Sequence, residues 1–504
     1  MNDQEKKEKA ERLAFSRPID VHRWSDYPEV NAAVNQLFDE ITSSDINPDG
    51  KLKRVREPEK LKRHIKMVVL DLYVASLTDP DLFIGYSRRP ENYANKTRYD
   101  NLHINCRRLI RVVDGLKKLG YIENHKGFQD MTTGRGFQSR MKATEKLLTL
   151  IENAHKIRPA MVGKPEDIEL IVLNEDDPTG RKTYDGKKIK VLKEYKDTPE
   201  TIKMRENAQL INKRLSHYHI GLEVTDTTLD DINEQLKRDP DPEKGPIDFL
   251  GTRLYRVFND NFGRGGRFYG VWWQNIPKEY RKYITINTKD TIELDYSGLH
   301  LNILYAENGL EAPDDPYSIK GIPESFRGDI KVTLNTILNA KSKQSAIKAI
   351  RQKLPDEKLP EGISKVEELI DKLEELHEPI KHHFYSDEGA RLQAVDSQIA
   401  ERVLLRMNKA NAATLPVHDS FIVIYNFKDL LLETMEEVFK EVVGTEIGIK
   451  PKVSTRQERQ KLHQQQKEQP DWDIEDTSNF VAIVEERKQY SKYYNRLKDW
   501  NDNR

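Results

Sequence analysis

The amino-acid sequence predicts an α+β protein with several domains. Its 504 residues correspond to roughly three domains of about 150 residues each. From Glu59 to about Pro159 the apolar pattern runs helix, helix, strand, strand, and the later part of the chain alternates strand-like runs with helical stripes. Two of those later runs place an aspartate, Asp295 or Asp419, at the end of a strand. This mixture of two periodicities, with no internal repeat, is the basis of the α+β prediction.

The composition indicates a cytoplasmic protein. Hydrophobic residues make up 37% and charged residues 33% of the chain, and no run of about 18 or more apolar residues could form a membrane span. The first residues are polar and carry no apolar signal segment, so secretion is not expected. A single cysteine, Cys106, excludes a disulfide framework and a zinc site built on several thiolates.

The distribution of charge suggests nucleic acid as a partner. The formal net charge is −1, but basic residues are concentrated in three segments. Residues 51–66 hold eight basic and two acidic residues, 88–142 hold thirteen and five, and 251–282 hold seven and two. One such segment is usually only a solvated face, whereas three of them beside nucleic-acid-like motifs favour contacts with phosphates.

Residues 59–159 have the element order of a DNA-binding domain. A first helix opens near Leu61, a second is expected over Asn101–Leu119, and Gly120 stands where a helix commonly ends. Residues 121–140 then form two strand-like stretches, so the order resembles a winged helix-turn-helix domain whose wing is 121–140. An ordinary helix-hairpin packing unit has the same pattern. The apolar stripe of the second helix is Leu109, Ile110, Val113 and Leu116, and the side chains that would meet phosphates are Arg107, Arg108, Arg111, Lys117 and Lys118.

The remaining boundaries follow composition. The segments are a charged N-terminal stretch (1–58), a connecting region with a strand-like run at 168–173 and a helix around 199–215 (160–250), the part that carries the chemistry (251–455), and a charged, aromatic tail (456–504). The tail is either a helix docked on the body or a partner-binding segment, and the sequence leaves both open.

Two aspartates stand at strand ends in the chemical region. Thr291–Tyr296 alternates as a strand and leads into a helix over Leu299–Glu307, so Asp295 lies at their junction. Leu415–Tyr425 has two apolar runs around a polar trio, the pattern of a tight hairpin with His418 and Asp419 at its turn. Separately, these patterns also fit a helix cap and a polar turn.

Together, the two aspartates predict a metal site. They are 124 residues apart (419 − 295), and each is at the end of a buried strand, so they can meet across one sheet. Such a pair would hold two Mg²⁺ (or Mn²⁺) ions roughly 3.5–4 Å apart. Mg²⁺ suits carboxylates combined with substrate phosphates.

A helix is predicted between the aspartates, over residues 326–339. Its polar face carries Arg327, Lys331, Asn335 and Asn339, one every four residues, and its apolar face carries Ile330, Leu334, Ile337 and Leu338. Two cations one turn apart suit a triphosphate. A surface helix with two basic residues would look the same when taken alone.

Five ordered elements resemble the family A DNA polymerases, the bacterial DNA polymerase I family. Asp295-Tyr296-Ser297 is similar to the first palm motif. The run 417–421 is similar to the last palm motif, and closer still to that of the phage-type single-subunit RNA polymerases. The Arg-x3-Lys spacing resembles the fingers helix that grips the nucleotide. The other two elements are Gly266-Arg267-Phe268-Tyr269 followed by Gln274-Asn275-Ile276-Pro277, and Gln393 within 392–397.

The resemblance implies a right-hand palm-fingers-thumb polymerase with an N-terminal winged helix-turn-helix-like domain, 160–250 being thumb-like. It covers about 200 residues and does not explain the first 250. The implied roles are metal binding by Asp295, Asp419 and the carbonyl of Tyr296, triphosphate binding by Lys331 and Arg327, contact of His418 with the primer end, and contact of Arg267 and Gln393 with the minor groove of the primer-template.

The chain departs from the family at several positions. His300 replaces the glutamate that blocks the ribose 2′-hydroxyl, and an imidazole is bulky enough to act as such a gate. Asn335 and Asn339 fall where the family has aromatic rings. Ser420 replaces a glutamate, so the metal site rests on two acids. The N-terminal half offers no convincing acidic exonuclease set, so proofreading is not expected.

The sequence therefore predicts a nucleotidyltransferase, foremost a DNA-directed DNA polymerase that uses nucleoside triphosphates and a DNA primer-template. The enzyme alternatives are a primase or RNA-polymerase-like activity and template-independent addition. The alternative from another class is a DNA-binding replication or regulatory protein with an inactive palm. The oligomeric state and the biological setting stay open.

Overall fold

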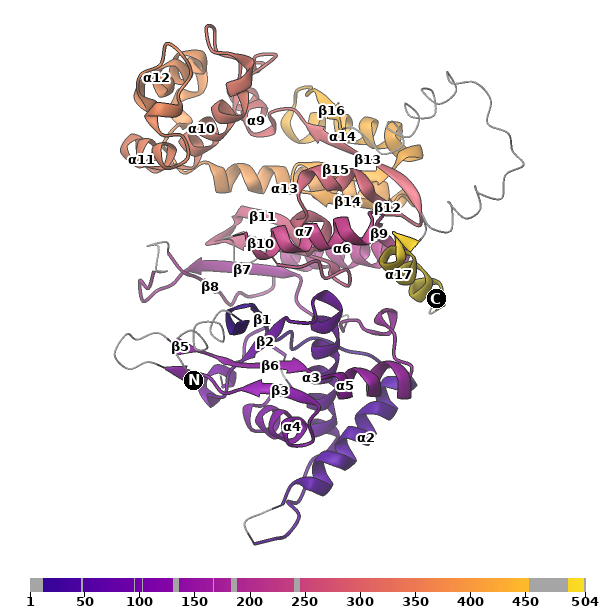
Figure 1. Cartoon of the computed structure of the whole chain (residues 1–504). Coiled ribbons are helices and arrows are strands. Elements are labelled where there is room, and N and C mark those ends of the chain that lie inside the picture. The colour runs from indigo at the N-terminus through magenta and orange to yellow at the C-terminus, as the bar shows by residue number, and fades with distance from the viewer. Residues whose placement is uncertain are drawn as a thin grey trace, which may run out of the picture.

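The structure, a computed structural model, describes residues 12–46, 49–94, 96–101, 103–129, 136–165, 167–182, 188–239, 245–452 and 488–502. Helices and strands are mixed along this described chain, which confirms the α+β class. Figure 1 shows an N-terminal unit at the bottom, a layer of strands in the middle, and the largest sheet with its helices at the top. Within the described ranges, no helix is both long and apolar enough to cross a membrane.

The N-terminal unit packs helices against a four-stranded sheet. Its strands are ordered β1-β2-β6-β3, with β1 parallel to β2 and the other pairs antiparallel. Helices α2, α3 and α4 contact one another and enclose an aliphatic core. The elements are β1 (Ser16–Pro18), α2 (Pro28–Ser44), α3 (Pro58–Thr78), β2 (Phe83–Tyr86), η1 (Pro90–Tyr93), α4 (Cys106–Lys118), β3 (Ile122–His125), β4 (Phe128–Gln129), β5 (Gly136–Phe137), β6 (Ser139–Ala143), α5 (Glu145–Thr149), η2 (Leu150–Ala154) and η3 (Pro159–Met161).

Helix α4 begins later than the sequence pattern predicts. The expected start at Asn101 is wrong, because the side chain of Asn105 caps the helix by accepting a hydrogen bond from the amide of Arg108 (3.2 Å). The expected end is confirmed, since Gly120 has a φ of 77° and its amide donates to the carbonyl of Lys117. Of the predicted apolar stripe, Leu109, Val113 and Leu116 are buried and Ile110 is half-buried.

A second sheet, ordered β11-β10-β7-β8, forms the middle layer. Strand β7 pairs in parallel with β10, so this sheet joins strands from both sides of residue 250, where the sequence suggests a boundary. The helix expected around 199–215 is confirmed as α6, which Thr198 caps. The elements are β7 (Ile171–Asp176), β8 (Lys190–Leu192), α6 (Pro199–Leu215), β9 (Ile220–Leu222), α7 (Asp226–Lys237), β10 (Thr252–Asn259) and β11 (Asn261–Val271).

The largest sheet runs β14-β15-β13-β12-β9, and β16 also pairs with β13. Helices α13 and α14 pack against each other, α13 lies along β11, and α14 contacts β13. Helices α10, α11 and α12 form the group at the upper left of Figure 1. The elements are α8 (Trp272–Asn275), η4 (Lys278–Tyr283), β12 (Ile284–Ile286), β13 (Lys289–Tyr296), α9 (Leu299–Glu307), η5 (Glu324–Phe326), α10 (Arg327–Asn339), α11 (Lys343–Lys353), η6 (Asp356–Lys358), α12 (Val366–Leu376), η7 (Glu378–His383), α13 (Gly389–Lys409), β14 (Thr414–Val417), β15 (Ser420–Ile424), η8 (Tyr425–Phe427), α14 (Lys428–Val443) and β16 (Ile449–Pro451).

The elements expected around the two aspartates are confirmed. The strand that carries Asp295 is β13, the following helix is α9, and the hairpin with His418 and Asp419 at its turn is β14–β15. The helix between them is α10, and all four of its predicted apolar residues are buried. The apolar stripe explains this helix, because it packs into the same continuous core as β13 and β15.

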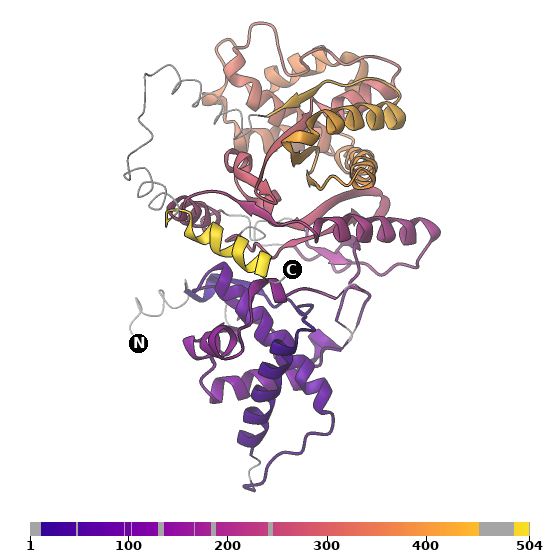
Figure 2. The same ribbon diagram turned by 90° about the vertical axis from the view of Figure 1, so that its right-hand side faces the viewer.

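Ionic contacts and the last helix join the N-terminal unit to the rest. Arg23 Nη2 lies 2.7 Å from Asp248 Oδ2, and Arg98 Nη1 lies 2.8 Å from Asp197 Oδ1. Helix α17 (Ser491–Asp502) contacts η3, α7 and β9, and Figure 2 shows it (yellow) between the upper and lower parts of the molecule. The described end of the tail is thus a docked helix, while 453–487 lie outside the described residues.

Candidate active site

Asp295 and Asp419 lie at the ends of adjacent strands. In the antiparallel pair β13–β15, Asp295 stands opposite Ser420, the residue that directly follows Asp419. The amide of Tyr296 faces the carbonyl oxygen of Asp419 at 3.5 Å. His418 takes a φ of 59° at the hairpin turn, the left-handed conformation that a two-residue turn requires. Strand register and turn type therefore bring together two aspartates that are distant in sequence.

The two carboxylates repel each other in a half-buried site. Burial, and next the charge of Asp419, raise the pKa of Asp295 to about 6, against the opposing charges of Lys452 and Lys331. A divalent cation would relieve this repulsion, so the donor set fits a hard metal ion. Among the described residues, no three His, Cys, Asp or Glu side chains converge as a metal cluster. Further ligands would have to be backbone, water or substrate oxygens. The Tyr296 side chain points away and donates to the carbonyl of Met435 (2.7 Å).

Two charged residues beside this pair were not identified from the sequence. Glu293 lies two residues before Asp295 and therefore on the same face of β13. It accepts a hydrogen bond from Ser420 Oγ (2.6 Å) and contacts Lys452 Nζ (2.5 Å). Lys452 Nζ also lies 3.4 Å from Asp295 Oδ2. Glu293 could have been identified from the sequence, because alternation along a strand places it on the same face as Asp295. No pattern near Lys452 in the sequence identifies that residue.

Of the polar face of α10, Lys331 lies close enough to Asp295 for their charges to interact. The charge of Lys331 lowers the pKa of Asp295, against the larger effects of burial and Asp419. Its Nζ lies 5.8 Å from the ring centroid of Tyr317. Arg327 is already paired: its Nε and Nη2 donate to the two carboxylate oxygens of Asp315 at 3.0 and 3.1 Å. Arg327 must exchange this partner before it can bind a phosphate.

The two asparagines of α10 are exposed. Asn339 Nδ2 donates to the carbonyl of Asn335 (2.7 Å). The Asn339 side chain also lies against Gly389 at the start of α13, because a Cβ at Gly389 would be 1.7 Å from its Oδ1. In this structure Asn339 contacts α13.

Arg267, His300 and the buried Asp396 form a charged cluster near the hairpin turn. Arg267 Nε donates to Asp396 Oδ2 (2.8 Å), and His300 Nε2 lies 3.3 Å from the same oxygen. Burial opposes ionisation of Asp396, but His300 and Arg267 outweigh it and hold its pKa below the ordinary value. Gln393, one turn before Asp396 on α13, is half-buried. The sequence did not identify Asp396, the residue that links two predicted site residues.

His418 lies next to Asp419 at the hairpin turn and within electrostatic range of Arg267 and Asp396. Its ring centroid is 5.7 Å from that of Tyr269. Burial, followed by the charge of Arg267, lowers the pKa of His418, so the imidazole is neutral near pH 7. A neutral imidazole is able both to donate and to accept a hydrogen bond.

The predicted phosphate-binding arginines of α4 are in different environments. Arg107 is exposed. Arg108 forms an ion pair with Glu57, and Arg111 Nε lies 2.7 Å from Asp45 Oδ2. Of the predicted wing, 130–135 lie outside the described residues.

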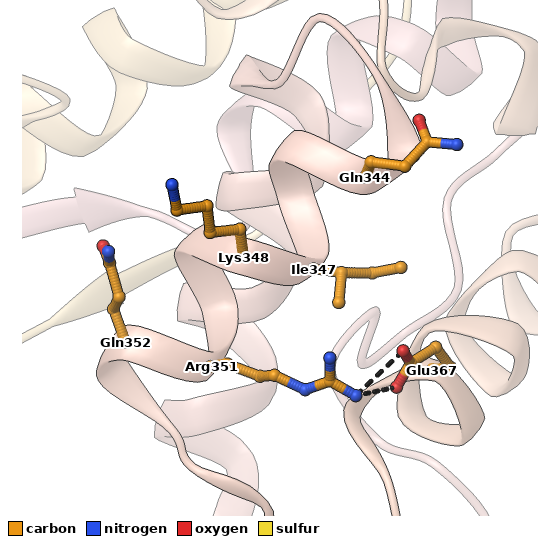
Figure 3. A pocket seen from close by; sticks show the side chains of 6 residues that line it. All are labelled: Gln344, Ile347, Lys348, Arg351, Gln352 and Glu367. Carbon is orange, nitrogen blue, oxygen red and sulfur yellow. Dashed lines mark hydrogen bonds and ion pairs between the residues drawn. The ribbon is translucent and has the colours of Figure 1, made fainter.

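A surface pocket on α11 and α12 is separate from the carboxylate site (Figure 3). Arg351 Nη2 donates to both oxygens of Glu367, at 2.9 and 2.7 Å, and these two side chains form one wall. Since its arginine is already bound to a carboxylate, this pocket offers no obvious anion site. The lining residues are Gln344, Ile347, Lys348, Arg351, Gln352 and Glu367.

No family model and no curated protein matches the chain. Among solved structures it is similar to one described as the POL domain of Pol1 from M. smegmatis in complex with DNA primer-template and dNTP. The identity is 12% and the TM-score is 0.29, with 45% of this chain and 50% of that chain covered, so the chain spans about half the length of that domain. A TM-score of 0.29 is too low to indicate a shared function.

Proposed function

We propose that the chain is a nucleotide polymerase that joins nucleoside triphosphates to a primer 3′ end, with deoxynucleotides preferred. The observation that carries the proposal is the pair formed by Asp295 and Asp419 at the ends of adjacent strands, with the pKa of Asp295 raised to about 6. Two neighbouring carboxylates repel each other when no cation is present, and a divalent cation bound between them removes this repulsion. The ordered motifs that resemble family A polymerases contain the same two aspartates.

Each part of the site has a role in this reaction. When bound, two Mg²⁺ (or Mn²⁺) ions would activate the primer hydroxyl and stabilise the leaving pyrophosphate. Asp295 and Asp419, with the carbonyl of Tyr296, would hold them. Lys331 would bind the triphosphate, and Arg327 would join it after leaving Asp315. His418 would contact the primer end.

The choice of sugar is assigned to His300, and contact with the minor groove to Arg267 and Gln393. The support for His300 is its position as the second residue of α9, five residues after Asp295, and its contact with Asp396 (3.3 Å). His300→Gly is expected to relax discrimination between dNTPs and NTPs; unchanged discrimination would remove this role. No proofreading exonuclease is part of the proposal, because the N-terminal half offers no convincing acidic set.

Primer extension tests the proposal. The purified full chain is given a labelled primer-template and Mg²⁺, with dNTPs or NTPs in separate reactions, and Asp295→Ala and Asp419→Ala run beside it. Template-directed extension that both variants lose is the expected result. Preference for NTPs would favour a primase or RNA-polymerase-like enzyme. Extension that does not depend on the template would favour a template-independent nucleotidyltransferase. No extension with DNA binding intact would contradict the proposal and favour a regulatory protein with an inactive palm.

We propose further that the N-terminal unit binds duplex DNA as a winged helix. The support is the element order α3, β2, α4, β3, β6, with β6 between β2 and β3 in the sheet. Helix α4 presents Arg107 to solvent. The pairs of Arg108 with Glu57 and Arg111 with Asp45 would have to open, or these arginines would contribute little.

DNA binding by the N-terminal unit can be measured with a duplex that is closed at both ends. This duplex has no 3′ end for the proposed palm to bind. Arg107→Ala is expected to weaken binding and to lower the slope of log affinity against log salt by about 1, as for one lost phosphate contact. Lys440→Ala, on the exposed side of α14, is the control. Equal affinity and equal slope for both variants would refute the role of α4.

A further inference from the structure

Lys452 and Glu293 face each other across two paired strands. Strand β16 runs antiparallel to β13, with Pro451 opposite Leu294, and the amide of Lys452 donates to the carbonyl of Glu293 (2.8 Å). Residues directly opposite in such a pair project from the same face of the sheet. Glu293 and Asp295 share that face as well, so the ladder brings the ammonium group of Lys452 to both carboxylates.

The ammonium group lies between the two acids. Lys452 Nζ is 2.5 Å from Glu293 Oε1 and 3.4 Å from Asp295 Oδ2. Glu293 has only 8% of its side chain exposed, while that of Lys452 has 42% exposed. A buried carboxylate needs a partner, and Glu293 has Lys452, the hydroxyl of Ser420 (2.6 Å) and, less closely, Arg281, whose Nη1 lies 3.5 Å from Oε1. Lys452 is therefore anchored at Glu293 and reaches toward Asp295.

We infer that Lys452 is the resident counter-ion of the proposed metal site and that Glu293 is the group that retains it. Lys452 balances the charge of Asp295 before a metal ion binds. When an ion binds, the ammonium would leave Asp295, and Glu293 would retain it beside the site. The inference rests on the proposed function, since it assumes that Asp295 and Asp419 bind the ion.

This arrangement gives Glu293 a role different from that of a metal ligand. No third acid joins Asp295 and Asp419 in a metal cluster among the described residues. Glu293 instead determines where the competing ammonium rests. Removing Lys452 and Glu293 together should then tighten metal binding, because the competitor disappears and no carboxylate is left unpaired. If Glu293 were a ligand, the same double change would weaken binding.

The test is Mn²⁺ affinity of the full chain without DNA or nucleotide, measured as free Mn²⁺ by electron paramagnetic resonance. Lys452→Met with Glu293→Gln is expected to bind Mn²⁺ roughly fivefold more tightly than the wild type, a modest gain because water screens the half-exposed lysine. Lys452→Arg keeps the charge and should bind as the wild type does. The control is Lys440→Met with Glu446→Gln, a remote surface pair whose Nζ and Oε1 are 3.0 Å apart, which should change nothing.

The outcomes separate this inference from the proposed function. Affinity of the double variant equal to or weaker than the wild type, while Asp419→Ala abolishes Mn²⁺ binding, would overturn the role of Lys452 and leave the metal site standing. Wild-type Mn²⁺ binding that Asp419→Ala does not change would instead remove the metal site itself. Melting curves of each variant confirm that it is folded.

Discussion

Replacing Gly221 with alanine should undock the last helix. Gly221 lies in β9, at the edge of the largest sheet, and α17 covers it. A Cβ at Gly221 would lie 2.8 Å from His219 Cε1, 2.8 Å from Tyr493 Cε2 and 3.2 Å from Thr285 Oγ1. The φ of Gly221 is not in the left-handed region, so the backbone accepts alanine and only the packing suffers.

The expected magnitude follows from the two short contacts. Tyr493 is only 2% exposed, and its hydroxyl is 3.1 Å from Thr285 Oγ1, so its ring has little room to move away from β9. Overpacking of this kind costs about 1–3 kcal/mol. The contact with His219 remains when α17 leaves, but the contact with Tyr493 is relieved, so the opening free energy of α17 should fall by an amount in this range. Its amides would then exchange roughly 5- to 150-fold faster.

Hydrogen exchange followed by mass spectrometry measures this directly in residues 491–502. The control is Gly245→Ala, where a Cβ meets nothing within 4 Å. Equal protection of α17 in Gly221→Ala, Gly245→Ala and the wild type would refute the docking of Tyr493 against the backbone of β9. A loss confined to α17, with β13 unchanged, would support it.

Two further predictions concern buried charge. Burial, followed by the charge of Arg496, lowers the pKa of His219 to about 4 from 6.5; docking of α17 is therefore fully favourable above pH 6.5 and weakens as pH falls toward 4, by at most about 3 kcal/mol. Exchange rates of α17 across this pH range check it, and a flat profile would contradict it. Asp396→Leu leaves the mostly buried Arg267 without its counter-charge and should destabilise the chain by about 3 kcal/mol in urea unfolding. Adding Arg267→Met should recover most of that loss; no recovery would refute the pairing.

The sequence predicted those parts of the site that depend on local periodicity. Helix α10 was expected over nearly its observed range because its apolar residues recur at helical spacing and pack into one core. The strand of Asp295 and the hairpin of Asp419 were predicted by alternation and by a polar turn. The contact between Asp295 and Asp419 was predictable because both aspartates end buried strands, and two buried strands can pair in one sheet.

The missed residues depend on contacts between distant segments. Lys452 reaches Glu293 across 159 residues, and Arg267 reaches Asp396 across 129. No local pattern records such a pair. The start of α4 was wrong for a different reason, since apolar spacing does not reveal that Asn105 caps the helix. The pairing of Arg327 with Asp315 was also invisible, because the sequence indicates a basic face and not its neighbours.

The most direct test of the central claim is single-turnover primer extension by Asp419→Ala, compared with Asp429→Ala, which changes an exposed aspartate on α14. If Asp295 and Asp419 hold the catalytic ions, Asp419→Ala should lower the rate of the first nucleotide addition roughly a thousandfold or more. Asp429→Ala should extend at the wild-type rate. Extension by Asp419→Ala within about tenfold of the wild-type rate, under the same Mg²⁺ concentration, would contradict the claim that this pair of aspartates is the catalytic centre.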